Sequence, residues 1–266
     1  AACVMTFEPH PREYFNPRSA PSRLTSLRDK LSVMSDMGVE EVIILPFNHD
    51  TAAISAINFV ERLVYIGMKS LLVGDDFRFG ARRAGDYALL ESLASPMGFG
   101  LSRMPSVMAS GVRISSTTLR QALEKGDLTK ARELLGRPYS MSGRVVAGQR
   151  IGRTLGFPTA NVKMNINVPP MSGIFAVQFH GISEKPLPGA ASLGTRPTVT
   201  HSTTPVLEVH LIDFKGNIYG NIVRVEFMRK LRDEIKYSNL GLLAEQIHRD
   251  VEEVRDYFGQ LNESVT

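Results

Sequence analysis

The sequence has almost no cysteine, because Cys3 is the only one among its 266 residues. A single cysteine cannot form an internal disulfide, and this excludes a metal site built from pairs of cysteines. Such usage is typical of a protein in a reducing cytoplasm. The sequence also lacks an apolar run of about 18 or more residues, as a membrane-spanning helix requires, and it lacks a signal peptide pattern. We therefore expect a cytoplasmic protein without a membrane partner.

Neither sign of charge dominates the sequence. The net charge is +4, from 31 Lys and Arg against 27 Asp and Glu, and no run of basic residues exceeds three. An excess this weak and scattered argues against nucleic acid as a partner. It fits an anionic ligand such as a nucleotide, although a slightly basic solvated surface explains it equally well.

The chain divides into two halves of different texture. Up to Gly136, short apolar runs such as 41–47 and 69–73 alternate with helical periodicity, as at 24–37. Strands that alternate with helices predict a parallel, doubly wound sheet with ligands at the carboxyl ends of its strands. Further helices are expected at 58–66, at 87–93 and twice within 116–135, with Ser116 and Asp127 as N-caps and Gly126 and Gly136 as stops.

The second half has the pattern of a β domain. The break at Pro138 places the domain boundary there, with an α/β domain at 1–137 and a β domain at 138–266. Closely spaced strands separated by turn signals predict a small antiparallel barrel, and the helical periodicity of 243–258 predicts a helix packed on it. The barrel strands are expected at 139–146, 174–180, 187–193, 206–212 and 222–227.

The most specific motif is GRVVAGQRIGRTLGFPTAN at 143–161. Its four glycines allow the backbone to approach a phosphate and present N–H groups to it, and Arg150 and Arg153 add positive charge. Thr159 and Asn161 are two apart on an extended segment, so both face one side and could reach one Mg²⁺ through oxygen. The usual P-loop pattern is absent. From the glycines alone, a set of tight turns is the more common explanation.

The part GRTLGFPTAN at 152–161 resembles the signature of riboflavin kinases. With the N-terminal motifs described below, the chain resembles the bifunctional bacterial riboflavin kinase/FAD synthetase family over residues 6–257. The resemblance implies that Thr159 and Asn161 bind Mg²⁺ and ATP. It also implies a glycine-rich flap that covers the phosphates and contains Gly148, Gly152 and Gly156.

Two further candidates lie later in the chain. Glu208 alternates with apolar neighbours and so points to one face of a strand, where an acid is more often an edge or solvent-facing residue. The family has a catalytic glutamate in a matching segment. The resemblance thus implies that Glu208 is the general base that accepts the proton of the terminal ribityl hydroxyl. It also implies that Arg232 contacts the flavin, with a charged lead-in to the last helix as the alternative.

The N-terminal half resembles the FMN adenylyltransferase module of the same family. The matching stretches are TFEPHP at 6–11, VGDDFRFG at 73–80 and ISSTTLR at 114–120. Hydroxyls at a helix start with an arginine one turn in make a phosphate site, although a plain N-cap explains the hydroxyls as well. The nucleotide-binding residues that the resemblance implies are Gly74, Asp75, Phe77, Ser115, Thr117 and Arg120.

One element of that module has no counterpart in the sequence. The module normally opens with a strand and a Gly-x-Phe-Asp-Gly-x-His-x-Gly-His segment, whose histidines contact the ATP phosphates, and His10 does not match it. We therefore expect the first strand and its helix to be missing and FMN adenylylation to be impaired. The other five histidines are isolated, without metal-ligand spacing, and we interpret each as structural or superficial.

The prediction is an enzyme that phosphorylates riboflavin to FMN with Mg²⁺ and ATP, releasing ADP, beside an impaired adenylyltransferase. One alternative is a module that binds flavin and nucleotide without turnover. Another is a nucleotidyltransferase for a different substrate, against which the missing histidine segment argues. Homo-oligomer formation is left open.

Overall fold

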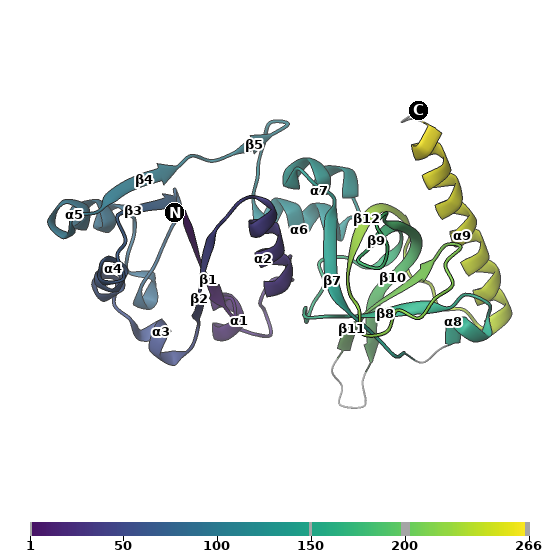
Figure 1. The fold of residues 1–266 in the computed structure, drawn as a ribbon. Coiled ribbons are helices and arrows are strands. Elements are labelled where there is room, and N and C mark those ends of the chain that lie inside the picture. The colour runs from purple at the N-terminus through teal and green to yellow at the C-terminus, as the bar shows by residue number, and fades with distance from the viewer. Residues whose placement is uncertain (1, 149–150, 198–202, 264–266) are drawn as a thin grey trace. The chain divides into compact units, whose positions relative to one another are not determined.

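The computed structural model describes residues 2–148, 151–197 and 203–263. The chain forms two compact units (Figure 1). Residues 1–21 and 38–114 make the N-terminal unit, and residues 22–37 and 115–266 make the barrel unit. The segment 22–37 thus belongs with the barrel, whereas the domain boundary placed at Pro138 stays a prediction.

The N-terminal unit contains parallel strand pairs, as the alternation of strands and helices predicts. Its elements are β1 Cys3–Glu8, α1 Pro11–Phe15, β2 Glu41–Pro46, α3 His49–Ala53, α4 Ala56–Tyr65, β3 Ser70–Gly74, η1 Ala81–Arg83, α5 Tyr87–Met97, β4 Gly100–Met104, β5 Met108–Ala109 and β6 Val112–Arg113. β1 pairs with β2 and β3 pairs with β4, both in parallel. Within the described ranges these two pairs are not hydrogen-bonded to each other.

The helices of this unit begin and end where local chemistry dictates. The side chains of Ser55 and Asp86 cap α4 and α5 by accepting a backbone N–H three residues on. Gly98 ends α5 in the left-handed conformation. Val60 and Leu90 then bury fully in a core cluster on the helix faces toward the strands. These contacts hold β3 and the segment that follows it.

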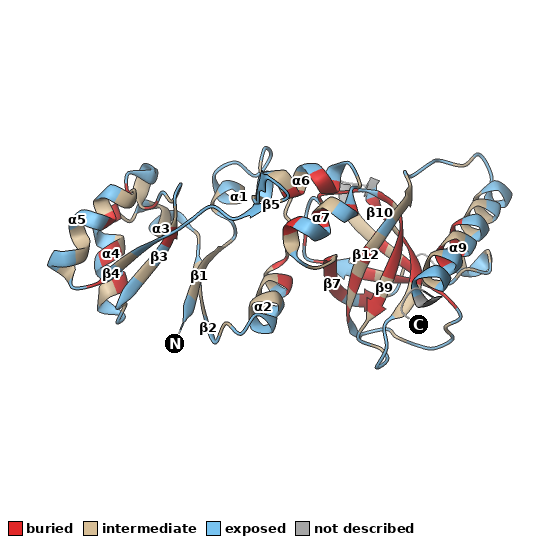
Figure 2. Cartoon of the chain, turned by 90° about the horizontal axis from the view of Figure 1, so that it is seen from above, coloured by how far each residue is buried: buried red, intermediate tan, exposed pale blue. Residues whose placement is uncertain are grey.

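The barrel unit is built on a closed barrel of antiparallel strands (Figures 1 and 2). Its strands are β7 Tyr139–Val146, β8 Thr159–Met164, β9 Gly173–His180, β10 Leu187–Pro197, β11 Thr203–Leu211 and β12 Ile222–Arg232. The order around the barrel is β10-β11-β8-β7-β12-β9. Phe175, Phe179 and Phe227 are buried inside it. The predicted antiparallel barrel is confirmed. It contains one more strand than predicted, because β8 forms where only an extended segment was expected.

The remaining elements of the barrel unit are helices. They are α2 Leu27–Asp36, α6 Ser116–Glu124, α7 Leu128–Leu135, α8 Ile151–Thr154 and α9 Leu240–Glu263. Val251 and Val254 of α9 are buried in one cluster with Ala176 and Ala190 of the barrel. The prediction that the last helix packs on the barrel is therefore confirmed.

The caps of these helices fall close to the predicted positions. Asp127 caps α7 and Gly136 ends it in the left-handed conformation, as predicted. The N-cap of α6 is Ser115 and the prediction of Ser116 is wrong, because the Ser115 hydroxyl accepts the backbone N–H of Thr118 at 3.1 Å. Either serine has a side chain that can cap a helix. The helix begins directly after Ser115, so that residue is the N-cap.

A buried tyrosine ties the segment before α2 to the barrel. The Tyr139 hydroxyl at the start of β7 donates to the carbonyl of Leu24 at 2.7 Å. Burial, with a smaller effect of the nearby Asp29 carboxylate, raises the pKa of Tyr139 well above its usual value. The tyrosine is therefore held neutral as a hydrogen-bond donor.

Candidate active site

One pocket of the barrel unit brings the predicted kinase residues together. It has a volume of about 270 Å³ and lies between β8, β10, β11, the end of β12 and α9. Thr159, Glu208 and Arg232 all line it. Three residues predicted from distant stretches of sequence thus meet at one cavity.

Glu208 stands in the centre of a row across three strands. In the register, Glu208 of β11 lies opposite Asn161 of β8 on one side and opposite Ser192 of β10 on the other. Residues directly opposite each other in antiparallel strands share a face of the sheet. The Thr159 hydroxyl donates to a Glu208 carboxylate oxygen at 3.4 Å. The arrangement gathers a carboxylate, a hydroxyl and an amide at one spot.

The glycine-rich segment lies against these residues. Gly148 touches the Asn161 side chain so closely that a Cβ there would overlap its amide atoms. A Cβ on Gly152 would meet the carbonyl oxygen of Phe157, and Gly156 has a φ of +87° that favours glycine. The backbone therefore approaches the candidate metal ligands where side chains would not fit. Arg150, expected to add charge here, lies outside the described residues.

His210 is a pocket residue that the sequence analysis missed. It lies opposite Thr159 in the register, and its Nδ1 is 2.9 Å from the carbonyl oxygen of Pro158. Its ring meets the ring of Phe157 edge-on, with centroids 5.4 Å apart. The signal for it was its position two residues after Glu208, which places both side chains on one face of β11.

Arg232 lies at the pocket in a partly buried ion pair. Its Nε and Nη2 donate to the two carboxylate oxygens of Asp250 on α9, at 2.8 and 2.6 Å. This hydrogen bonding raises the pKa of Arg232 above its usual value. Gln246 also donates to Asp250 at 2.9 Å. The predicted flavin contact of Arg232 stays a prediction, whereas its bond to Asp250 could not be foreseen.

The residues predicted for the adenylyltransferase half fall in both compact units. Gly74 ends β3, and Asp75 beside it accepts a hydrogen bond from Ser106 at 3.4 Å. Phe77 stacks on Phe79, with ring centroids 5.4 Å apart. Gly74, Asp75 and Phe77 are therefore neighbours at the carboxyl end of one strand, where a doubly wound sheet binds its ligands.

The other three belong to the barrel unit. Ser115 is the N-cap of α6, which agrees with the alternative of a plain N-cap. Thr117 lies in the first turn of this helix. The Arg120 Nε donates to the carbonyl of Ser22 at 2.7 Å. Their role in binding a nucleotide stays a prediction.

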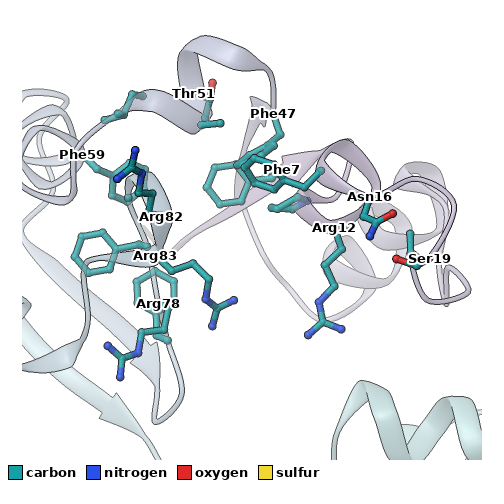
Figure 3. A pocket seen from close by; sticks show the side chains of 18 residues that line it. Phe7, Arg12, Asn16, Ser19, Phe47, Thr51, Phe59, Arg78, Arg82 and Arg83 are labelled. Atoms are coloured by element: carbon teal, nitrogen blue, oxygen red, sulfur yellow. The ribbon is translucent and has the colours of Figure 1, made fainter.

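A second cavity lies within the N-terminal unit (Figure 3). It has a volume of about 550 Å³. The side chains of Arg12, Arg78 and Arg83 extend away from the rings of Phe7 and Phe47 in the view of Figure 3. A cavity with aromatic walls and cationic side chains suits a planar ring that carries an anionic group. Of its lining, the sequence analysis named Phe77 as a binding residue, and the matching stretches 6–11 and 73–80 contain Phe7 and Phe79 as well. No motif marked Phe15, Phe47 or Phe59.

Two negative findings limit the chemistry of the described residues. Among them, no group of three or more His, Cys, Asp or Glu side chains could hold a metal ion. In the same part of the chain, no helix is both long and apolar enough to cross a membrane.

Comparison with known proteins defines the class first. A family model described as riboflavin kinase matches residues 135–258, and one described as FAD synthetase matches residues 1–118. The two halves thus fall in two classes of transferase that make flavin nucleotides.

Individual relatives cover nearly the whole chain. The bifunctional riboflavin kinase/FMN adenylyltransferase of Escherichia coli (strain K12) is 46% identical over 258 residues, which are 96% of this chain and 82% of that protein. Its counterpart in Haemophilus influenzae is 42% identical over 257 residues, 96% and 83% of the two chains. This chain belongs to the bifunctional riboflavin kinase/FMN adenylyltransferase family.

A solved structure agrees in fold. The crystal structure of a protein from Streptococcus pneumoniae described as a macrolide-efflux protein superposes with a TM-score of 0.75 at 28% identity. It covers 95% of this chain, and this chain covers 83% of it. The likeness extends over both compact units.

Proposed function

We propose that the barrel unit is a riboflavin kinase that transfers the γ-phosphoryl group of ATP to the terminal ribityl hydroxyl of riboflavin, giving FMN and ADP. The observation that supports it most is the hydrogen bond between Thr159 and Glu208, two residues that line one pocket. Asn161 lies opposite Glu208 in the strand register. The single cysteine fits an enzyme of the cytoplasm.

Glu208 is the general base of this reaction. It accepts the proton of the ribityl hydroxyl as that oxygen attacks the γ-phosphorus and the bond to the bridging oxygen of ADP breaks. Phosphoryl transfer needs mainly positioning, charge neutralisation and such a base. Thr159, hydrogen-bonded to Glu208, keeps the carboxylate next to the reacting oxygens.

The donor set fits Mg²⁺ bound together with the phosphates of ATP. A hydroxyl and an amide oxygen, from Thr159 and Asn161, are hard oxygen ligands, and Mg²⁺ commonly takes few protein ligands beside substrate phosphates. The ion would neutralise charge on the β- and γ-phosphates. The close approach of Gly148 to Asn161 supports a flap of Gly148, Gly152 and Gly156 that covers these phosphates.

The test is to incubate the purified chain with riboflavin, ATP and Mg²⁺ and to separate the flavins by chromatography. We expect FMN from the wild-type chain and at least a tenfold slower rate from Asn161→Ala, together with a higher Mg²⁺ requirement. If a folded sample binds riboflavin and nucleotide but returns riboflavin unchanged, the chain is instead a binding module without turnover.

A second function is supported by the aromatic cavity of the N-terminal unit. We propose that this cavity binds the flavin ring of FMN. Gly74, Asp75 and Phe77, at the end of β3, are proposed as nucleotide-binding residues. Ser115, Thr117 and Arg120, which belong to the barrel unit, are proposed as nucleotide-binding residues on the motif resemblance. The printed sequence contains no His-x-Gly-His segment, so we expect residues 1–266 by themselves to form FAD from FMN slowly. FAD at a rate equal to FMN formation would contradict this expectation.

A further inference from the structure

The segment that joins β12 to α9 forms one side of the barrel pocket. We call residues 233–239 the rim segment. Glu234, Ile235 and Tyr237 of this segment line the pocket. The rim segment contains neither helix nor strand. Its position therefore depends on contacts made by side chains at its ends rather than on a backbone ladder.

One end of the rim segment is fixed to α9 through Arg232. This residue ends β12, directly before the rim. One edge of its guanidinium binds both carboxylate oxygens of Asp250, and its Nη1 donates to the carbonyl of Asp233 at 3.0 Å. Asp250 is only 4% exposed. The guanidinium thus joins α9 and the first residue of the rim.

The rim has a further contact on β10. The Ser192 hydroxyl donates to the Glu234 carboxylate at 3.2 Å. That carboxylate also lies against Gly194, where a Cβ would overlap it. Between Glu234 and the start of α9 the rim contributes Ile235 and Tyr237 to the pocket. An apolar and an aromatic side chain are the surfaces that an uncharged flavin ring contacts favourably.

The donors of Arg232 are largely committed to these partners. Two of its nitrogens bind a buried carboxylate, and the third binds the backbone of the rim. Breaking a buried ion pair is costly, so the guanidinium stays with Asp250 when a ligand binds. The flavin ring carries no anionic group that would compete for it.

We propose that Arg232 is a positioning residue and that Asp250, acting through Arg232, sets the place of the rim segment and so the affinity for riboflavin. This inference rests on the proposed kinase function. Asp250 lines the pocket, but its carboxylate oxygens are bonded to Arg232 and Gln246, so in this scheme it touches neither substrate. Its loss raises the KM for riboflavin more than it lowers kcat.

The experiment compares riboflavin KM, ATP KM and kcat for the full-length wild type, Asp250→Asn, Arg232→Met and the double variant Arg232→Met/Asp250→Leu. The matched control is Asp213→Asn. Arg255 of α9 also binds both carboxylate oxygens of its partner, Asp213, through Nη2 and Nη1 at 2.8 and 2.9 Å, but this pair is exposed and away from the pocket lining. Asparagine also tolerates the positive φ of Asp213.

We expect Asp250→Asn to raise the riboflavin KM about tenfold or more, the effect of losing a charge-assisted hydrogen bond, with kcat and ATP KM changed less than about threefold. Asp213→Asn changes none of them. The double variant has about the same riboflavin KM as Arg232→Met, because Asp250 acts through Arg232 and methionine cannot donate to the carbonyl of Asp233. It also keeps the test decisive should Asp250→Asn fold poorly.

Two results would overturn the proposal. One is a riboflavin KM in Asp250→Asn no higher than in Asp213→Asn. The other is a double variant whose riboflavin KM is raised by the product of the two single effects, which would mean that Asp250 acts independently of Arg232. If the wild type forms no FMN, the kinase function fails, and riboflavin binding measured by quenching of its fluorescence still tests the same variants for the positioning role.

Discussion

Replacing Gly148 with alanine is expected to displace the Asn161 side chain and slow phosphoryl transfer. An alanine Cβ would overlap the amide carbon, oxygen and nitrogen of Asn161. The amide must move by about 1 Å to restore ordinary contact. A misplacement of about 1 Å in a positioning group can cost about 100-fold in rate, which corresponds to about 2.7 kcal/mol. We therefore expect kcat/KM for Mg·ATP to fall about 100-fold.

The assay is the initial rate of FMN formation at varied Mg·ATP with saturating riboflavin. Gly259→Ala is the matched control, because Gly259 lies in α9 with open space around its Cβ position and without a positive φ. Its rate is expected to match the wild type. Far-UV circular dichroism verifies that both variants are folded. A Gly148→Ala rate within threefold of the wild type would refute the close approach of the flap to Asn161.

Three other predictions concern stability and the second cavity. Tyr139→Phe is expected to lose about 1–3 kcal/mol in urea unfolding at pH 7, because the Leu24 carbonyl loses its donor. Since the pKa of Tyr139 is raised on folding, its contribution is complete below about pH 10 and falls as the pH rises further, so the gap between variant and wild type must narrow there; a constant gap contradicts the buried hydroxyl. Phe179→Ala is expected to cost about 3–5 kcal/mol by calorimetry or urea unfolding, because its ring is fully buried in the barrel, and a loss under 1 kcal/mol would contradict that packing. Phe77→Ala is expected to weaken FMN binding to the N-terminal unit about tenfold, measured by calorimetry, without changing the riboflavin KM of the kinase; a change of the riboflavin KM alone would contradict the separate cavity.

The barrel could be predicted from the sequence because turn signals separate closely spaced strand-like segments. β7 spans 139–146 as predicted, and its inward residues include Met141 and Val145. β8 alternates just as regularly, since Ala160, Val162 and Met164 are buried and the residues between them are not, but it was predicted only as an extended segment because it follows directly on the glycine-rich motif. The candidate metal ligands Thr159 and Asn161 occupy alternate positions on the less buried face of this strand.

The site residues were predictable where a motif marks them and not where only packing joins them. Glu208 and Thr159 are 49 positions apart, and only the motif resemblance predicts that both belong to one site. Asp250 has no motif of its own, and only the fold of α9 onto the barrel brings it to Arg232. The aromatic cavity is assembled from separate segments, of which 6–11 and 73–80 were marked by the motif resemblance, and only the fold shows that they line one cavity.

The general base is tested most directly by comparing the wild type with Glu208→Gln in a single-turnover assay of FMN formation from riboflavin, ATP and Mg²⁺. Glutamine keeps the size of the side chain and can still accept a hydrogen bond from Thr159, but it does not take up the proton. We predict that the wild type forms FMN and that Glu208→Gln is slower by about 100- to 10,000-fold, with unchanged riboflavin binding. Equal rates in the two proteins would contradict the role of Glu208.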